Sequence, residues 1–397
     1  MKVGYLGSPG PYGHFTLFRN VRAGLTAQGQ PIRWIANGRW AAETMRDPAW
    51  ESEAANGEVV GGDSTDMDTL GKALVRHIID QKYEAILFNF PQNISEMNVA
   101  RYLPESILRV LVVGMMGSGT YRLCRGVRDY VHATVALAPR IRDDLVGHFD
   151  FDAARTSVCG GIDLEPFRNL PERQAAKSLR LVYFGRITEG QKGIFNLPLI
   201  LQRVLDEEVV LHVIGGGPDL GALKERCAKF GPRVTFGEPV RQEDIPRMLV
   251  GHDVFVFPTR YEGLGYVLPE ALAAGCVPVC SHIRGVTDYL VRDGETGFLF
   301  PVDDVETAAA HVRRLARDRQ LLKRCSDAAV ADARERFDCI AAGAAWAKLL
   351  RDLKKDPPTV AATLPLERWA YPRQFNRGLR GYVPERLKNV VRAWMAR

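Results

Sequence analysis

The stretch of sequence that decides the fold runs from Val254 to Gly275 and reads VFVFPTRYEGLGYVLPEALAAG. Its first four residues, Val254–Phe257, are apolar and β-prone, which predicts a buried strand. A loop with two glycines, Gly263 and Gly265, follows, and a helix is expected to begin directly after it. A buried strand, a glycine loop and a helix in this order predict a parallel α/β sheet with the loop at its carboxyl edge.

The same alternation of short apolar runs and helix-period stretches continues along the whole chain. The strands predicted for the first half are Val3–Leu6, Ile32–Ala36, Ala85–Phe90, Arg109–Val113 and Thr134–Ala138. Those predicted for the second half are Leu179–Phe184, Val209–Ile214, Val234–Phe236, Val254–Phe257 and Val277–Cys280. Because 397 residues are too many for one hydrophobic core, we expect two doubly wound, Rossmann-like α/β domains facing a central cleft.

The predicted boundaries divide the chain into four parts. An N-terminal domain covers residues 1–168, a linker residues 169–178, a C-terminal domain residues 179–355 and a basic tail residues 356–397. The linker is polar and contains Pro171, which is typical of a domain boundary. The long helix that ends near Leu353 is expected to close the C-terminal domain.

Composition and charge exclude several classes of protein. Hydrophobic residues make up 46% and charged residues 25%, which is ordinary for a globular protein. The net charge is +6, and the tail from Asp356 onward holds eight cations against three acids, which leaves the body nearly neutral. A nearly neutral body argues against a nucleic-acid-binding core.

The sequence also bears on the compartment. No charged leader or apolar core of a signal peptide precedes the first predicted strand, and no apolar run approaches the roughly 18 residues of a membrane span. The seven cysteines form no Cys-x-x-Cys pair, so we expect reduced thiols. These features together predict a cytoplasmic protein.

The glycine loop after Phe257 carries two glutamates and a predicted anion site. Glycines let the backbone approach a ligand closely, and unbonded amides at a helix start suit a diphosphate. Glu262 lies in the loop and Glu270 more than a turn into the helix, so the two carboxylates can reach different parts of one extended ligand. Vicinal hydroxyls of a hexose or a ribose would suit them. The alternative is a tight turn with two surface glutamates.

A second motif follows the predicted strand Leu179–Phe184. Arg186 and, after a polar loop, Lys192 can neutralise a diphosphate, with Arg as a planar fork and Lys as a point charge. A solvated basic loop is the alternative. The run Val213–Pro218, which includes Gly216, adds another glycine turn after a strand and is weak evidence alone.

Taken together, these motifs resemble the retaining group 1 glycosyltransferases of the GT-B fold. The resemblance is best over Leu179–Asp303, which also contains the run Asp293–Leu299. Over the first half it is looser and depends on the glycine loop near Gly13 and on Gly160-Gly161-Ile162-Asp163.

The resemblance implies roles for particular residues. Arg186 and Lys192 would hold the donor diphosphate as it leaves, Glu262 would bind the donor sugar, and Glu270 the ribose. The other donor-binding positions that it implies are Gly13, Gly216, Gly263, Leu264, Gly265 and Tyr266. It implies no metal and no cofactor beyond a UDP-, GDP- or similar nucleotide-sugar donor, because cations and backbone amides replace a divalent ion.

Two positions bear on that implication. Asp66-Met67-Asp68 is an Asp-x-Asp motif, and since it precedes a helical pattern we predict helix capping, with metal ligation as the alternative. Many relatives have a His after the strand that corresponds to Arg109–Val113, whereas Gly114–Thr120 has none. Either Ser118 or Thr120 substitutes for it or the register differs; His14 could also reach the cleft, unless it is an ordinary surface or core histidine.

The function implied is transfer of a hexosyl unit, with retention, to a hydroxyl acceptor in the synthesis of a glycan, glycolipid or glycosylated metabolite. The acceptor would be a sugar, a lipid-linked glycan or a small molecule, contacted by loops such as Asn89–Asn93 and Met115–Tyr121. Two alternatives stay open: a nucleotide-sugar epimerase of related fold, which needs no acceptor, and a non-catalytic nucleotide-sugar-binding protein.

The sequence of the tail suggests a membrane surface as a further partner. On a helix, Glu385–Arg397 places Leu387, Val390, Val391, Trp394 and Met395 on one stripe. Such a helix could lie on the anionic inner face of the cell membrane and bring the protein to a lipid-linked acceptor. The alternative is a tail that folds back and packs across the first domain.

Overall fold

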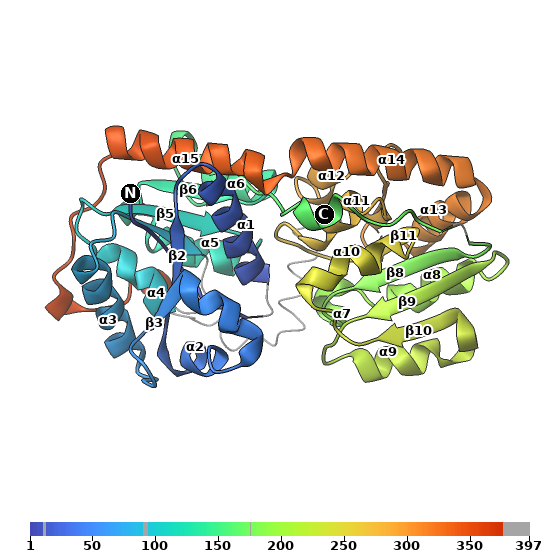
Figure 1. Ribbon diagram of the computed structural model, residues 1–397, viewed down its shortest axis with the longest axis horizontal. Helices are drawn as coiled ribbons and strands as arrows, with labels where there is room; N and C mark the ends of the chain where they lie inside the picture. Colours follow the sequence, from blue (N-terminus) through green and yellow to red (C-terminus); the bar gives the residue numbers. More distant parts are fainter. Residues whose placement is uncertain (11–12, 90–93, 175, 376–397) are drawn as a thin grey trace. The chain divides into compact units, whose positions relative to one another are not determined.

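Two parallel sheets organise the chain in the computed structural model (Figure 1), which describes residues 1–10, 13–89, 94–174 and 176–375. Among the described residues, one compact unit contains Met1–Asp163 and residues 339–375, and the other contains Leu164–Asp338. The predicted pair of Rossmann-like domains is therefore confirmed.

The first sheet has seven strands in the order β3-β2-β1-β4-β5-β6-β7. They are β1 (Val3–Leu6), β2 (Ile32–Asn37), β3 (Gly57–Val60), β4 (Ala85–Asn89), β5 (Leu108–Val113), β6 (Ala133–Ala136) and β7 (Thr156–Val158). The α-helices of this unit are α1 (Gly13–Ala27), α2 (Gly38–Thr44), α3 (Met67–Asp80), α4 (Ile94–Asn98), α5 (Ser118–Arg125), α6 (Pro139–His148) and α15 (Cys339–Lys355). The strand order reverses at β1, which pairs with both β2 and β4, as in doubly wound folds.

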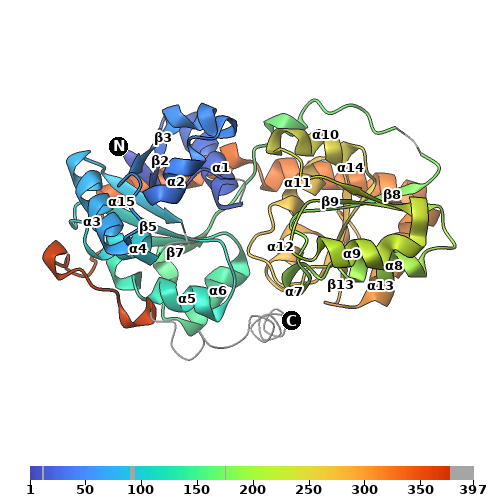
Figure 2. The same ribbon diagram turned by 90° about the horizontal axis from the view of Figure 1, so that it is seen from below.

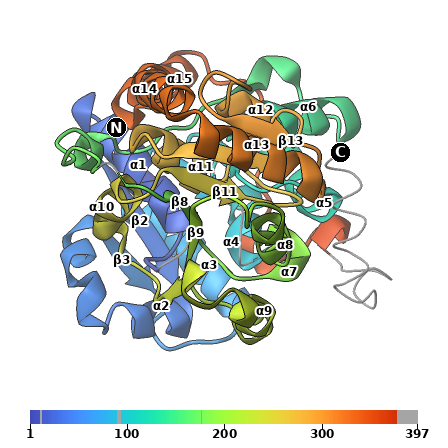
Figure 3. The same ribbon diagram turned by 90° about the vertical axis from the view of Figure 1, so that its right-hand side faces the viewer.

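The second sheet has six strands in the order β10-β9-β8-β11-β12-β13. They are β8 (Leu179–Phe184), β9 (Val209–Ile214), β10 (Val234–Gly237), β11 (Val254–Phe257), β12 (Val277–Ser281) and β13 (Phe298–Phe300). Its helices are α7 (Glu189–Lys192), α8 (Asn196–Arg203), α9 (Leu220–Cys227), α10 (Ile245–Val250), α11 (Val267–Ala273), α12 (Thr287–Leu290), α13 (Val305–Arg317) and α14 (Arg319–Arg336). α13 packs against α8, and α14 packs against α11. Figure 3 shows this unit turned toward the viewer.

The ten predicted strands all correspond to observed strands, whereas β3, β7 and β13 were missed. Each missed strand has only three or four residues and lies at one end of its sheet. A short strand at a sheet edge needs no long apolar run, because only one neighbour pairs with it.

The last long helix differs from the prediction. α15 packs against α1 of the first unit instead of closing the C-terminal domain. The two helices meet at glycines: a Cβ on Gly343 would lie 2.1 Å from the carbonyl oxygen of Gly24, and one on Gly24 would lie 2.2 Å from that of Cys339. Periodicity identifies the apolar face of such a helix but not the surface that covers it, so the unit that α15 joins could not be predicted from the sequence.

The predicted linker, residues 169–178, lies within the second unit. Arg173 donates hydrogen bonds to the carbonyl oxygens of Ala274 (2.9 Å) and Gly275 (2.8 Å), just after α11 ends, and to that of Val250 (3.2 Å) at the end of α10. A cation at the carboxyl end of a helix is favourable, and here it fastens the segment to the second unit. The division between the units therefore falls at Asp163, before the predicted linker.

Residues 356–375, which we call the strap, pack along the first unit (Figure 2). The Trp369 ring stacks on Tyr102 with centroids 4.5 Å apart, and a Cβ on Gly71 of α3 would lie 2.3 Å from it. Further on, a Cβ on Gly126 would lie 2.8 Å from the Phe375 ring. This part of the tail thus folds back on the first unit, while the predicted helix Glu385–Arg397 lies outside the described residues.

Other sequence predictions can be compared with the structure. Asp66 caps α3 and accepts a hydrogen bond from the amide of Thr69 at 2.8 Å, which confirms the capping role. All seven cysteines are free thiols, and six of them are buried. Within the described ranges, no helix is both long enough and apolar enough to cross a bilayer.

Candidate functional site

The exits of β8 and β9 meet at glycines in the second unit. Gly215 has φ +138°, and a Cβ there would lie 2.0 Å from the carbonyl oxygen of Gly185, so no larger residue fits. The carbonyl oxygen of Gly216 accepts a hydrogen bond from the amide of Ile187 at 2.9 Å. The glycine turn predicted from the sequence therefore supports the loop that carries Arg186.

The end of α7 approaches the exit of β11 just as closely. Gly193 has φ +58°, and a Cβ there would lie 2.2 Å from the carbonyl oxygen of Pro258. The amide of Arg260 donates to the carbonyl oxygen of Gln191 at 2.8 Å. These contacts bring Lys192 beside the loop that follows β11.

Lys192 and Glu262 form a direct ion pair, and both are largely shielded from water. Their side chains are 14% and 6% exposed. The hydroxyl of Thr259 donates to Oε1 of Glu262 at 2.9 Å, and Nζ of Lys192 lies 5.0 Å from the centroid of the Phe257 ring. The alternative of a surface glutamate therefore does not hold for Glu262.

Arg186 lies at the exit of β8, which is the neighbour of β11 in the sheet. Its side chain is exposed, and no hydrogen bond or ion pair of the described residues engages it. The buried hydroxyl of Tyr183 donates to the carbonyl oxygen of Arg186 at 2.6 Å. Burial raises the pKa of Tyr183, the charge of Glu262 raises it further and the charge of Arg186 lowers it. Arg186 therefore follows the strand next to the one that leads to Glu262, at the same carboxyl edge of the sheet, while Lys192 and Glu262 are in direct contact.

The loop between β11 and α11 presents unused donors. In the described part of the chain, no hydrogen bond uses the amides of Gly263, Leu264 or Gly265. Gly265 has φ +71°, and a Cβ there would lie 3.7 Å from Oε2 of Glu262. Since α11 has only 7 residues, we attribute the affinity of this loop for anions to these amides and to the nearby cations rather than to the helix dipole.

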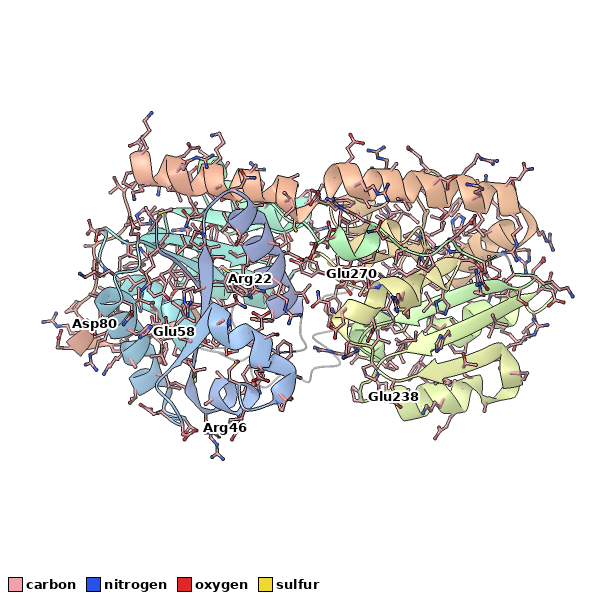
Figure 4. The ribbon with its side chains drawn as sticks, viewed as in Figure 1. Arg22, Arg46, Glu58, Asp80, Glu238 and Glu270 are labelled. Carbon is pink, nitrogen blue, oxygen red and sulfur yellow. The ribbon has the colours of Figure 1, made fainter. Side chains whose placement is uncertain are left out.

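Glu270, which Figure 4 labels on α11, is 7% exposed. Burial raises its pKa to about 8. No side chain or amide of the described residues hydrogen-bonds to its carboxyl group, so both oxygens are able to accept hydrogen bonds from a ligand. Glu270 is therefore not a surface glutamate either.

The other predicted positions are less informative. Tyr266 is partly buried directly before α11, and Gly13 is the exposed first residue of α1, in the first unit. Ser118 and Thr120 lie in the first turn of α5, after β5. The side chain of His14 and residues 90–93 lie outside what the structure describes. Among the residues that are described, no three His, Cys, Asp or Glu side chains are grouped to hold a metal.

Three features of the site were missed by the sequence analysis. They are the hydrogen bond from Thr259 to Glu262, the buried hydroxyl of Tyr183, and an ion-pair cluster of Arg260 with Glu189 and Asp303. Thr259 and Glu262 stand in the same quoted stretch, but the partners of Arg260 come from α7 and from beyond β13. Sequence spacing carries no signal for such contacts.

Comparison with known proteins gives a family match within the second unit and partial matches to several glycosyltransferases. Residues 178–318 match the family model described as glycosyl transferases group 1. The D-inositol 3-phosphate glycosyltransferase of Streptomyces avermitilis is 32% identical over 213 residues, which are 47% of this chain and 45% of that protein. The sulfoquinovosyl transferase SQD2 of Arabidopsis thaliana is 32% identical over 137 residues, 33% of this chain and 26% of that protein. The chain thus spans less than half the length of these relatives.

Solved structures match over more of the chain. HepE from Anabaena, solved with UDP and glucose, has a TM-score of 0.72 at 17% identity and covers 89% of this chain and 100% of its own. Sucrose-phosphate synthase from Thermosynechococcus elongatus has a TM-score of 0.73 at 16% identity, with 89% and 98% covered. At such low identity these structures establish the fold, which is of the GT-B type.

Proposed function

We propose, because this chain belongs to the group 1 glycosyltransferases through residues 178–318, that it transfers a hexosyl unit from a nucleoside-diphosphate sugar to a hydroxyl acceptor, with retention. The observation that carries the proposal is the shielded Lys192–Glu262 pair beside the exposed Arg186 and the unbonded amides of Gly263–Gly265. Cations and amides collected at one sheet edge are suited to an anionic ligand.

The donor diphosphate would be bound by Arg186, Lys192 and the loop amides. Negative charge grows on the diphosphate as the glycosidic bond breaks, and groups already aimed at it lower the barrier without reorganising. Glu262 would accept hydrogen bonds from the sugar hydroxyls, held in place by Thr259 and Lys192. For retention, the acceptor hydroxyl would approach the face from which the diphosphate leaves.

The nucleoside would lie toward Glu270, Gly216 and Tyr266. A ribose diol can donate two hydrogen bonds to one carboxylate, and Glu270 has a carboxyl group with no partner in the described residues. We also propose that the loop at Gly13 in the first unit approaches the bound donor. Because the HepE structure contains UDP and glucose, UDP-glucose is the first donor to test.

The test compares Glu262→Ala with Glu335→Ala, a change at an exposed glutamate on α14. Release of nucleoside diphosphate is measured with a panel of nucleotide sugars and polyol acceptors. We expect Glu262→Ala to lower the rate by about 100-fold or more and Glu335→Ala to leave it unchanged.

Wild-type turnover by the Glu262→Ala variant would overturn the assignment. Donor binding without any release of diphosphate would indicate a binding protein, and interconversion of donors without an acceptor would indicate an epimerase. One assay distinguishes these outcomes, because it follows the nucleotide-sugar donor, any interconverted donor and the released nucleoside diphosphate.

We further propose that the basic segment after Phe375 contacts an anionic membrane surface. Its sequence supports this, with the cations Arg377, Arg380, Arg386, Lys388, Arg392 and Arg397. The strap, which ends at Phe375, is itself packed on the first unit, so truncation after Phe375 should leave the fold intact. Pelleting with vesicles of anionic lipid should be lost on truncation; equal pelleting of both forms would contradict the proposal.

A further inference from the structure

Lys192 is carried by α7, a helix of 4 residues that has little stability of its own. Its position must therefore be fixed by neighbouring groups. Glu189, the first residue of α7, makes two such contacts. Its amide donates to Oδ2 of Asp219 at 2.8 Å, and its Oε2 accepts from the amide of Phe195 at 2.8 Å. The remaining carboxylate oxygen of Glu189 faces Arg260.

Arg260 lies between two carboxylates, and its side chain is only 19% exposed. Nη2 is 2.7 Å from Oε1 of Glu189, and Nε is 2.8 Å from Oδ1 of Asp303. Nη1 donates to the main-chain carbonyl of Glu189. Burial alone would lower the pKa of Arg260, but its hydrogen bonds and charge contacts with Glu189 and Asp303 raise it.

Asp303 joins this cluster from beyond β13. Its φ is +66°, in the left-handed region that aspartate adopts more often than most residues other than glycine. In that conformation its Oδ1 accepts from Arg260 and also from Nδ2 of Asn196 at 3.0 Å. Asp303 therefore links Arg260 to the start of α8 as well.

We propose that Arg260 is a positioning residue that fixes α7 against the exit of β11 and thereby sets the place of Lys192 beside Glu262. The inference rests on the proposed function, since it gives Lys192 the donor diphosphate as its ligand. The guanidinium of Arg260 contacts Glu189 and Asp303, and its amide donates to the carbonyl oxygen of Gln191. These contacts link α7 directly to the loop that follows β11.

Arg260 is not itself assigned to the diphosphate. Three of its five N–H donors are used by protein oxygens and its side chain is only 19% exposed, whereas the guanidinium of Arg186 is exposed and has no partner among the described residues. A phosphate ligand needs donors that are not already committed. The two arginines therefore have different tasks at the same edge of the sheet.

The test is a double-mutant cycle between Arg260→Gln and Lys192→Ala. Donor-dependent release of diphosphate and the melting temperature are measured for the wild type, both single variants and the double variant. In the wild-type background we expect Arg260→Gln to lower kcat/KM about tenfold or more, since a small misplacement of a catalytic cation is costly. In the Lys192→Ala background we expect less than about a twofold further loss, while Arg260→Gln lowers the melting temperature equally in both backgrounds.

Two further variants keep the test decisive. Arg260→Lys retains a cation and should recover part of the activity, and it serves if Arg260→Gln does not fold. Arg317→Gln is the matched control, because it removes contacts with Glu207 and Asp206 before β9, at the opposite edge of the sheet, and should leave kcat/KM unchanged.

Additive losses in the cycle would overturn the inference alone, because Arg260 would then act independently of Lys192. Wild-type turnover by the Lys192→Ala variant would overturn the proposed function as well. A tenfold loss in the wild-type background that shrinks when Lys192 is absent would support both.

Discussion

The two sheets share a doubly wound, parallel topology, and the shielded charges at the two ends of their strands have different surroundings. In the second unit, Lys192, Glu262 and Glu270 follow the carboxyl ends of β8 and β11. At the amino ends, the buried Asp253 pairs with Arg180 in the second unit, and in the first unit the fully buried Arg109 donates to main-chain carbonyl oxygens. The charges at the amino ends are engaged by the protein itself, whereas we propose that those at the carboxyl ends of β8 and β11 serve a ligand.

The strap strengthens this contrast. It crosses the amino-end side of the first sheet, where the amide of Ala361 donates to the carbonyl oxygen of Asp129 at 2.7 Å. A cavity of about 340 Å³ lies there, against the starts of β6 and β7, and Arg128 and Arg155 on its wall are paired with aspartates. Paired cations under a covering segment stabilise the unit, whereas the unpartnered Arg186 is available to a ligand. The comparison teaches that topology alone does not locate a site.

The largest effect that we expect is on turnover, at Lys192. Lys192→Ala should lower kcat by about 100- to 1,000-fold, because it removes a cation from the departing diphosphate. It also leaves Glu262 buried without its partner, so the melting temperature should fall. Lys323→Ala, at an exposed pair on α14, is the control in a diphosphate-release assay. Similar rates for both variants would contradict the proposed role of Lys192 at the donor diphosphate.

The next effect is on the stability of the first unit. Gly343→Ala would put a Cβ 2.1 Å from the backbone of Gly24, so α1 and α15 must separate, and we expect a loss of about 1–3 kcal/mol. Gly147→Ala, at a glycine with nothing within 4 Å, is the matched control. Chemical denaturation gives the free energies of unfolding. An unchanged midpoint for Gly343→Ala would show that α15 does not pack as described.

Trp369→Ala should have a somewhat smaller effect, because Trp369 is only partly buried. Loss of its stacking on Tyr102 and of the hydrogen bond from Nε1 to Asp68 at 3.2 Å should cost about 1–2 kcal/mol. The exposed neighbour Arg368 provides the control, Arg368→Ala. Increased proteolysis between Lys355 and Phe375 would report release of the strap, and equal protection of both variants would contradict its docking.

The smallest effect concerns pH and Glu270. Since its pKa is raised to about 8, the folded protein favours the protonated acid, and this contribution to stability is lost as pH rises from about 4.5 through 8. Glu270→Gln, which cannot ionise, should therefore gain about 1 kcal/mol over the wild type at pH 9 and nothing at pH 4. It should also weaken nucleotide binding. An equal effect at both pH values would show that Glu270 is not buried as an acid.

The sequence predicted the strands well where burial on both faces makes them apolar throughout, as in Val254–Phe257 and Leu179–Phe184. It also selected Lys192 and Glu262, which form an ion pair, and Arg186, which follows the neighbouring strand; their role in binding a donor stays a prediction. It could not predict that Lys192 pairs with Glu262, because that contact requires Gly193 to approach Pro258 across two strand exits. The partner of α15 depends in the same way on two glycines that are far apart in the chain.

The most direct test of the central claim is calorimetric titration of UDP and GDP, with uridine and guanosine as references that lack phosphate. The expected result is binding of at least one diphosphate, much weaker binding of its nucleoside, and loss of that difference in the Arg186→Gln/Lys192→Ala variant. Equal affinity for nucleoside and diphosphate, or an undiminished difference in the variant, would contradict a diphosphate site between Arg186, Lys192 and the glycine loop.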